Sequence, residues 1–232
     1  MSMDTELSYL PGLSYLPELL KGLGTTLELT FASVLLGCVL ALLFTLVLTL
    51  RIKVLNSLVR LQILLFTGTP LLVQIFLIYY GPAQFDLFKD SRLWPLLSEP
   101  WFCAMLALAL NSAAYSTQLF KGAIDNVAPG EWEACYALGM TKVQALGKVI
   151  LPHAIRRALP AYGNEMILIM KGSSLASTIT LMDLMGYASR LNARTYDTLT
   201  VFTMAGVIYL ALTGIMTLLV RLLERKALAF SR

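Results

Sequence analysis

The chain has 232 residues, of which 57% are hydrophobic and only 14% are charged, and its mean hydropathy is +0.72. Soluble domains carry about 25% charged residues, so this composition excludes an ordinary soluble domain and indicates a chain that lies in a lipid bilayer. The net charge of +4 would suggest a nucleic-acid partner for a soluble protein. In a membrane protein, the enrichment of Lys and Arg on the cytoplasmic side already explains it.

Five apolar stretches predict an all-α membrane protein. A helix needs roughly 20 mainly apolar residues to cross about 30 Å of hydrocarbon. The stretches that meet this requirement are residues 23–50, 58–81, 101–120, 161–182 and 200–223. Gly68 and Pro70 interrupt the second stretch, and Gly172-Ser173-Ser174 argues against an unbroken helix in the fourth.

The distribution of charge predicts the orientation of these spans. Most basic residues fall on one side of the predicted bundle: Arg51, Lys53, Arg60, Lys121, Lys142, Lys148, Arg156, Arg157, Arg221, Arg225, Lys226 and Arg232. Cytoplasmic loops retain Lys and Arg, so we expect the N-terminus outside and the C-terminus inside. The acidic Asp4, Glu6 and Glu18 agree with an outer N-terminus. Because that segment lacks the basic start of a cleaved signal, the first span is expected to remain in the protein.

A long polar stretch, EWEACYALGMTKVQALGKVILPHAIRRALP at residues 131–160, separates the third and fourth spans on the predicted cytoplasmic side. Pro129 and Gly130 break the chain, and Glu131 and Glu133 then occupy the first turn of a predicted helix, where carboxylates favour the positive end of the helix dipole. Gly139 offers a turn after this helix.

Helical spacing returns from Thr141 to Leu151, and Pro152 is expected to bend this second helix and Pro160 to end it. The stretch therefore predicts a helix, a turn and a helix across the inner face of the membrane. Periodicity alone equally fits a surface helix on a channel or carrier.

The spacing of residues within the stretch is more specific. It resembles the E-A-A-x3-G-x9-I-x-L-P signature of permease subunits in ABC importers, and the matching positions are Glu133, Ala134, Cys135, Gly139, Val149, Leu151 and Pro152. Cys135 replaces Ala and Val149 replaces Ile, and both changes are conservative in size.

The resemblance extends over nearly the whole chain. Residues 66–82, 108–124, 159–177 and 224–230 look like the polar amino-acid branch of that family, and most like M-type permeases of arginine importers. It implies a type I importer permease fold, with residues 1–232 as one transmembrane domain and a coupling-helix loop at about residues 121–160. The residues that would couple to an ATPase are Glu131, Glu133, Ala134, Gly139, Leu151 and Pro152.

The same resemblance implies the partners. They are a homologous Q-type permease, two ATP-binding subunits, a soluble periplasmic amino-acid-binding protein and a small amino acid, at the bacterial inner membrane and without nucleic acid. The sequence contains no G-x-x-x-x-G-K-[ST] loop, so we expect no enzyme activity and no cofactor on this chain, with ATP and Mg bound by a partner. The scattered Cys38, Cys103 and Cys135 predict neither a disulfide nor a metal site.

Polar residues inside the predicted spans are the candidates for substrate contacts, because such groups are costly in lipid and usually face a cavity or a partner. The candidates are Asn111, Ser112, Tyr115, Glu165, Gly68, Thr69, Gln74 and Asp183. A carboxylate such as Glu165 suits a guanidinium group. Asn111 and Glu165 fit a buried helix-to-helix hydrogen bond equally well, and Asp183 is favoured as a helix cap or a contact to the binding protein.

Other functions remain open at this point. In an ion-gradient-driven carrier, Glu165 and Asp183 would relay protons, and a non-transporting assembly or sensory subunit would leave uptake intact when deleted. Permeases for histidine, ornithine, lysine or glutamine share most of the pattern. Relatives often have Arg before the Gly-Thr-Pro of the second span, whereas Thr67 stands here, which is compatible with a cationic substrate.

Overall fold

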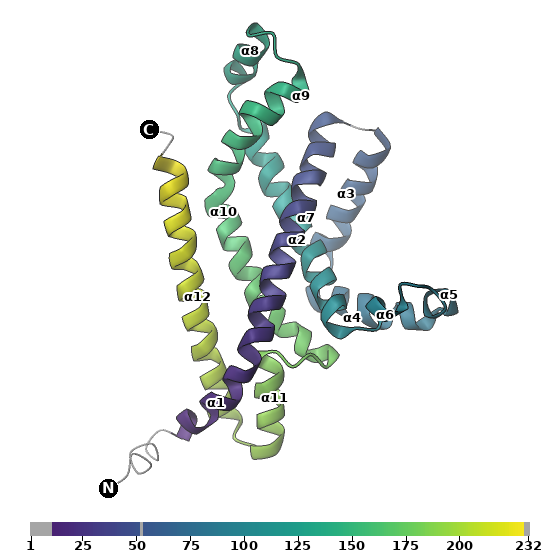
Figure 1. Ribbon diagram of the computed structural model, residues 1–232, viewed down its shortest axis with the longest axis vertical. Helices are drawn as coiled ribbons and strands as arrows, with labels where there is room; N and C mark the ends of the chain where they lie inside the picture. Colours follow the sequence, from purple (N-terminus) through teal and green to yellow (C-terminus); the bar gives the residue numbers. More distant parts are fainter. Residues whose placement is uncertain (1–10, 52, 230–232) are drawn as a thin grey trace. The chain divides into compact units, whose positions relative to one another are not determined.

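The computed structural model describes residues 11–51 and 53–229, and within these ranges the chain is built of helices without a β-strand (Figure 1). This confirms the predicted all-α class. The α-helices are α1 (Leu16–Leu19), α2 (Leu23–Leu50), α3 (Lys53–Gly68), α4 (Leu71–Tyr80), α5 (Asp86–Lys89), α6 (Trp94–Leu97), α7 (Pro100–Asp125), α8 (Pro129–Ala137), α9 (Lys142–Ala145), α10 (Leu151–Gly172), α11 (Leu184–Thr195) and α12 (Thr198–Ala229).

Shorter helical turns connect several of these helices. The 3-10 turns are η2 (Pro11–Tyr15), η3 (Leu20–Gly22), η4 (Pro82–Gln84) and η6 (Ser173–Ile179), and η5 (Leu146–Ile150) is a π-helical turn. Asp4, Glu6 and Arg232, which entered the predicted orientation, lie outside the described residues.

Two helices in the described part are long and apolar enough to cross a membrane, Gly12–Leu50 and Thr198–Arg225. They correspond to the first and fifth predicted spans. Two broken helix pairs pass the same test only when each pair is taken together, Lys53–Gly68 with Leu71–Gln84 and Lys142–Ile179 with Leu184–Thr195. The count is thus two spans, or up to four. The expected third span, α7, is not among them, because polar residues such as Asn111 and Gln118 dilute its apolar sequence.

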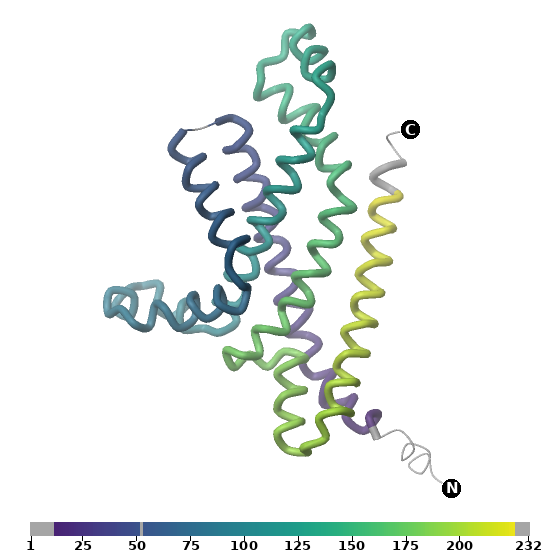
Figure 2. Tube along the Cα trace, turned by 180° about the vertical axis from the view of Figure 1, so that it is seen from behind, coloured from purple at the N-terminus to yellow at the C-terminus, as the bar shows by residue number. Residues whose placement is uncertain are grey.

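The chain divides into two compact units. The first comprises the chain up to Ser33, Leu71–Leu108 and Leu168–Ile215. In it, the start of the chain packs on α11: the Arg194 guanidinium pairs with Glu18, and the Tyr15 hydroxyl donates to Asp197 over 3.5 Å. Figure 2 shows the short turn that joins α11 to the first residues of α12.

The second unit comprises Val34–Pro70, Ala109–Ile167 and the chain from Met216 onward. Its helices approach closely at glycines. A Cβ atom on Gly37 of α2 would lie 2.9 Å from the Ser112 Cβ of α7, and one on Gly163 of α10 would lie 2.2 Å from Val220 of α12. Small residues of this kind let helix backbones pack closely in membranes, where burial of apolar surface gives no driving force.

The prediction that Pro160 ends the second helix of the polar stretch is wrong. Helix α10 runs from Leu151 to Gly172 with Pro160 inside it. Pro152 lies in the first turn of α10, two residues after the π-helical turn η5 ends at Ile150, and the expected bend there stays a prediction. A continuous buried stripe then holds the helix across Pro160: Ile150, Ala154, Ala158, Tyr162, Glu165 and Ile169.

The predicted break after Gly172 is confirmed. Helix α10 ends there, η6 follows, and Thr180 has a left-handed backbone with φ +69°. Asp183 then starts α11 as its N-cap, since the carboxylate accepts a hydrogen bond from the Gly186 N–H over 2.8 Å. The cap that the sequence favoured for Asp183 is therefore present.

Candidate functional site

The polar stretch forms an elbow in the second unit, which comprises α8, the turn after it, α9 and η5 (Figure 1). Its inner side is a small hydrophobic core of Ile124, Val127, Leu146, Ile150 and Ala154, with Trp132, Val149 and Leu151 packed against it. The core joins the end of α7 to the start of α10, so the elbow is packed against the helices on either side of it.

The turn at Gly139 has the hydrogen bonds of a Schellman motif. The Gly139 N–H donates to the Tyr136 carbonyl over 2.9 Å, and the Met140 N–H donates to the Cys135 carbonyl over 3.1 Å. Gly139 itself has φ +74°, a left-handed conformation that costs any residue with a Cβ atom about 1–2 kcal/mol. The predicted turn is confirmed, and its requirement for glycine is conformational.

Thr141 closes the other side of the turn with a capping box. Its hydroxyl accepts from the Gln144 N–H over 3.3 Å, and the Gln144 side chain accepts from the Thr141 N–H over 2.9 Å. Neither residue was among the predicted site residues, although the T-x-x-Q spacing is a helix-start signal. The turn is thus closed by hydrogen bonds on both sides, a Schellman motif before it and a capping box after it.

A polar contact also ties α8 to α10. The Glu131 carboxylate lies 3.2 Å from His153 Nδ1. Of the other predicted coupling residues, Glu133, Ala134, Gly139 and Pro152 are exposed, whereas Leu151 is half-buried. The tip of the elbow thus presents small and acidic groups beside large exposed apolar side chains, which are Tyr136, Leu138 and Val143.

The predicted substrate residues of the second unit lie on α3, α7 and α10. Asn111 is buried and its side-chain amide donates to the Phe66 carbonyl over 3.2 Å. This is the helix-to-helix hydrogen bond that the sequence left as an alternative to substrate contact. Ser112 is buried beside Gly37, and Tyr115 is 40% exposed.

Glu165 is 6% exposed, and no Lys, Arg or His lies within ion-pairing distance of its carboxylate in the part of the chain that the structure describes. A buried carboxylate without a counter-charge is costly unless it binds a proton or a cation. Glu165 therefore requires either a bound proton or a cationic group.

The break between α3 and α4 carries two more candidates. Gly68 and Thr69 are exposed, and the Thr69 hydroxyl donates to the Leu65 carbonyl over 2.6 Å. The remaining two belong to the first unit, where Gln74 is buried in α4 and Asp183 is fully buried as the cap of α11. Among the described residues, no three His, Cys, Asp or Glu side chains gather as a metal site.

Comparison with known proteins gives consistent matches. Residues 33–228 match the family described as "Binding-protein-dependent transport system inner membrane component". The arginine ABC transporter permease protein ArtM of Haemophilus influenzae is 56% identical over 94% of this chain and 96% of its own length. The protein of the same name in Escherichia coli K12 is 58% identical over 94% of this chain and 98% of its length.

A solved structure shares the fold. The chain from the crystal structure of an amino acid ABC transporter with histidines matches with a TM-score of 0.82 and 34% identity, covering 97% of this chain and 100% of its own. The fold of an ABC importer permease, expected from the elbow signature, is therefore observed.

Proposed function

We propose that this chain, which belongs to the family of binding-protein-dependent transport system inner membrane components, is the permease subunit of an ATP-driven importer of arginine or a related cationic amino acid. The observation that carries the proposal is the 56–58% identity to two arginine permeases over 94% of the chain.

The elbow would couple transport to ATP hydrolysis by seating in a groove of an ATP-binding subunit. Its exposed Tyr136, Leu138 and Val143 offer apolar surface to a partner, while Glu133 and Ala134 lie exposed on α8. Because the turn is closed by backbone bonds on one side and a capping box on the other, a push on α8 would be transmitted as a rigid displacement. The core beneath the elbow would pass that displacement to α7 and α10.

The substrate would meet Glu165. A guanidinium group donates paired hydrogen bonds to a carboxylate, and binding would supply the counter-charge that Glu165 lacks among the described residues. Ser112, Tyr115, Gly68, Thr69, Gln74 and Asp183 remain proposed contacts, and Asn111 would act by holding the break after α3 in place.

The assembly we propose has this chain as a single domain with five spans, an outer N-terminus and an inner C-terminus, in the bacterial inner membrane. It would pair with a homologous Q-type permease, accept substrate from a periplasmic binding protein, and dock on two ATP-binding subunits that hold ATP and Mg. The charge distribution and the family membership support this arrangement.

Uptake in cells tests the proposal. Radiolabelled arginine uptake would be measured with and without the gene, and with the gene restored on a plasmid, in competition with unlabelled arginine, histidine, ornithine, lysine and glutamine. We expect uptake to fall on deletion, to return with the plasmid, and to be competed best by arginine. Unchanged arginine uptake in the deletion strain would contradict it, and stronger competition by another amino acid would reassign the substrate.

A further inference from the structure

A cavity of about 560 Å³ opens in the second unit at the ends of three helices. It is lined by Leu48 and Arg51 at the end of α2, Asn56 and Arg60 on α3, and Lys121 and Asp125 at the end of α7. None of these residues belongs to the elbow or to the proposed substrate contacts. A second cavity of about 480 Å³ shares Leu48, Arg51, Lys121 and Asp125 and extends to Trp132 and Tyr136 of α8, so the first cavity adjoins the elbow.

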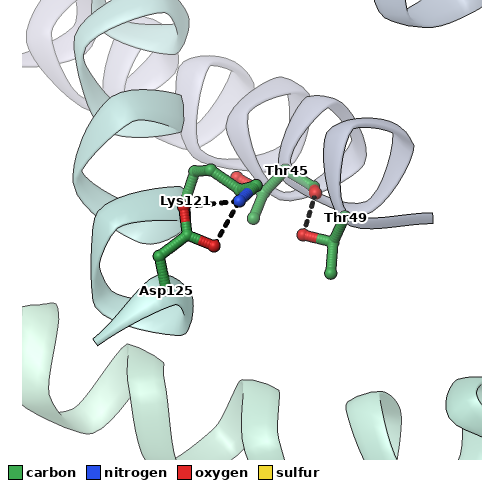
Figure 3. A network of polar contacts seen from close by, with 4 residues as sticks. All are labelled: Thr45, Thr49, Lys121 and Asp125. Atoms are coloured by element: carbon green, nitrogen blue, oxygen red, sulfur yellow. Dashed lines mark hydrogen bonds and ion pairs between the residues drawn. The ribbon is translucent and has the colours of Figure 1, made fainter. Parts of the chain in front are cut away.

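The charges in the cavity are unbalanced. Lys121 binds both carboxylate oxygens of Asp125, one helical turn away (Figure 3), so these two charges offset each other. Arg51 and Arg60 are exposed, and neither forms an ion pair within the described ranges. Two guanidinium groups without a counter-charge therefore face one cavity, and such groups bind a phosphate oxygen pair with matching geometry.

One of these groups follows directly on the end of α2. Arg51 has φ +57°, a left-handed conformation, and it lines the cavity. The side chain of Asn56 is also unsatisfied: its Oδ1 atom is buried and accepts no hydrogen bond among the described residues. The Oδ1 atom can therefore accept a hydrogen bond from a hydroxyl group of a ligand, whereas a phosphate oxygen offers it no donor.

Apolar surface adjoins the cationic groups. Leu48 lines the cavity, and on α3 the exposed Leu64 follows Arg60 by one helical turn, next to the exposed Leu61. The cavity also lies where the candidate span Gly12–Leu50 ends, which is the level of lipid headgroups. The ligand that fits is therefore one with an anionic phosphate and apolar chains.

We propose that this cavity binds the headgroup of an anionic phospholipid, with Arg51 and Arg60 as the cationic contacts of its phosphate and the Asn56 Oδ1 atom as an acceptor for a headgroup hydroxyl group. The acyl chains lie along Leu61 and Leu64 of α3. Basic pockets at the ends of membrane helices bind such headgroups. The proposal concerns the membrane environment of the chain and holds whichever amino acid is transported.

Thermal stability of the full-length chain, purified with its copurifying subunits and stripped of lipid in mild detergent, tests this. The probes are phosphatidylglycerol, phosphatidylcholine and inorganic phosphate, and native mass spectrometry counts bound lipid. We expect phosphatidylglycerol to raise the apparent Tm and to remain bound as one molecule. Equal stabilisation by phosphatidylcholine would overturn the proposal, and so would stabilisation by inorganic phosphate at the same concentration.

The variant Arg51→Gln/Arg60→Gln should weaken phosphatidylglycerol binding on the order of 25-fold, since each basic residue at an anionic surface contributes roughly five-fold. The matched control Lys53→Gln/Arg221→Gln removes the same number of exposed charges outside the cavity and should change binding less than about three-fold. Equal losses in both variants would overturn the site. The Arg51→Lys/Arg60→Lys variant keeps the charge and should therefore bind phosphatidylglycerol more tightly than the Gln variant. If a variant does not fold, the comparison of the three probes in the unmodified chain still tests the proposed lipid site.

Discussion

The side-chain amide of Asn111 donates to the backbone carbonyl of Phe66, 3.2 Å away. Phe66 lies four residues before Pro70, so in a continuous helix its carbonyl would accept from the N–H that proline lacks. Asn111 on α7 supplies the missing donor, and the Thr69 hydroxyl serves the neighbouring Leu65 carbonyl. Two carbonyls at the break after α3 thus have side-chain donors, which lowers the cost of the break in an apolar setting.

Replacing Asn111 with Leu should lower the apparent Tm of the detergent-solubilised chain by several degrees. A buried carbonyl left without a donor costs about 1–3 kcal/mol, and about 1 kcal/mol corresponds to roughly 2–4 °C for a chain of this size. The control is Gln118→Leu, which removes an exposed amide from the same helix and should leave the Tm unchanged. A normal Tm combined with a raised KM for uptake would instead assign Asn111 to the substrate.

Gly139→Arg should abolish transport and release the ATP-binding subunit from membranes. No atom lies within 4 Å of a Cβ built on Gly139, whereas its φ is +74°. The strain is therefore in the backbone, and the added bulk projects into open space, where we propose that the ATP-binding subunit docks. Gly139→Asn is the control, because Asn adopts left-handed conformations readily and should retain docking. Copurification of the ATP-binding subunit with tagged chain measures the effect; normal copurification and uptake for the Arg variant would refute the role of the turn.

Gly163→Ala should destabilise the chain by about 1–3 kcal/mol, the usual cost of overpacking, because the new Cβ atom would meet Val220 Cγ1 at 2.2 Å. The double variant Gly163→Ala/Val220→Ala removes the clash and should recover part of the loss. Apparent Tm values for the two single variants and the double variant provide the comparison. Strictly additive losses would mean that α10 and α12 do not pack at this point.

Glu165→Gln should raise the KM for arginine uptake at least about tenfold and leave the copurification of the ATP-binding subunit unchanged. Losing the charge removes a charge-assisted pair with the guanidinium group, which is worth about 1.5–3 kcal/mol, while the amide keeps the size of the side chain. The control is Glu28→Gln, an exposed acid in α2. Equal arginine uptake by the Glu165 variant and the unmodified chain would remove Glu165 from the substrate site.

The elbow was predictable because its signals are local. Gly139 predicts a left-handed turn, and Pro129 and Glu131 predict the start of a helix. Each of these signals lies within a few residues of the feature that it predicts. The prediction that Pro160 ends the helix failed for the opposite reason. Proline disrupts a helix locally, whereas the buried stripe that carries α10 past Pro160 depends on side chains from other helices.

The cavity at Arg51, Arg60 and Lys121 could not be predicted from the sequence. Its residues come from three helices, and about 60 positions separate Arg60 of α3 from Lys121 of α7. In the sequence, these basic residues indicate only the positive charge expected on the cytoplasmic side of a membrane protein. The partners of polar residues within the spans could not be predicted from the sequence either. Asn111 of α7, for example, donates to a carbonyl of α3.

Uptake of labelled arginine with the proton gradient collapsed tests the central claim most directly. Cells that carry the gene, and cells that lack it, would be treated with an uncoupler while fermentation keeps ATP high. Import driven by ATP predicts that the uptake that depends on this chain persists under these conditions and disappears when ATP is depleted. Loss of that uptake with the uncoupler alone, at unchanged ATP, would contradict the account and indicate an ion-gradient-driven carrier.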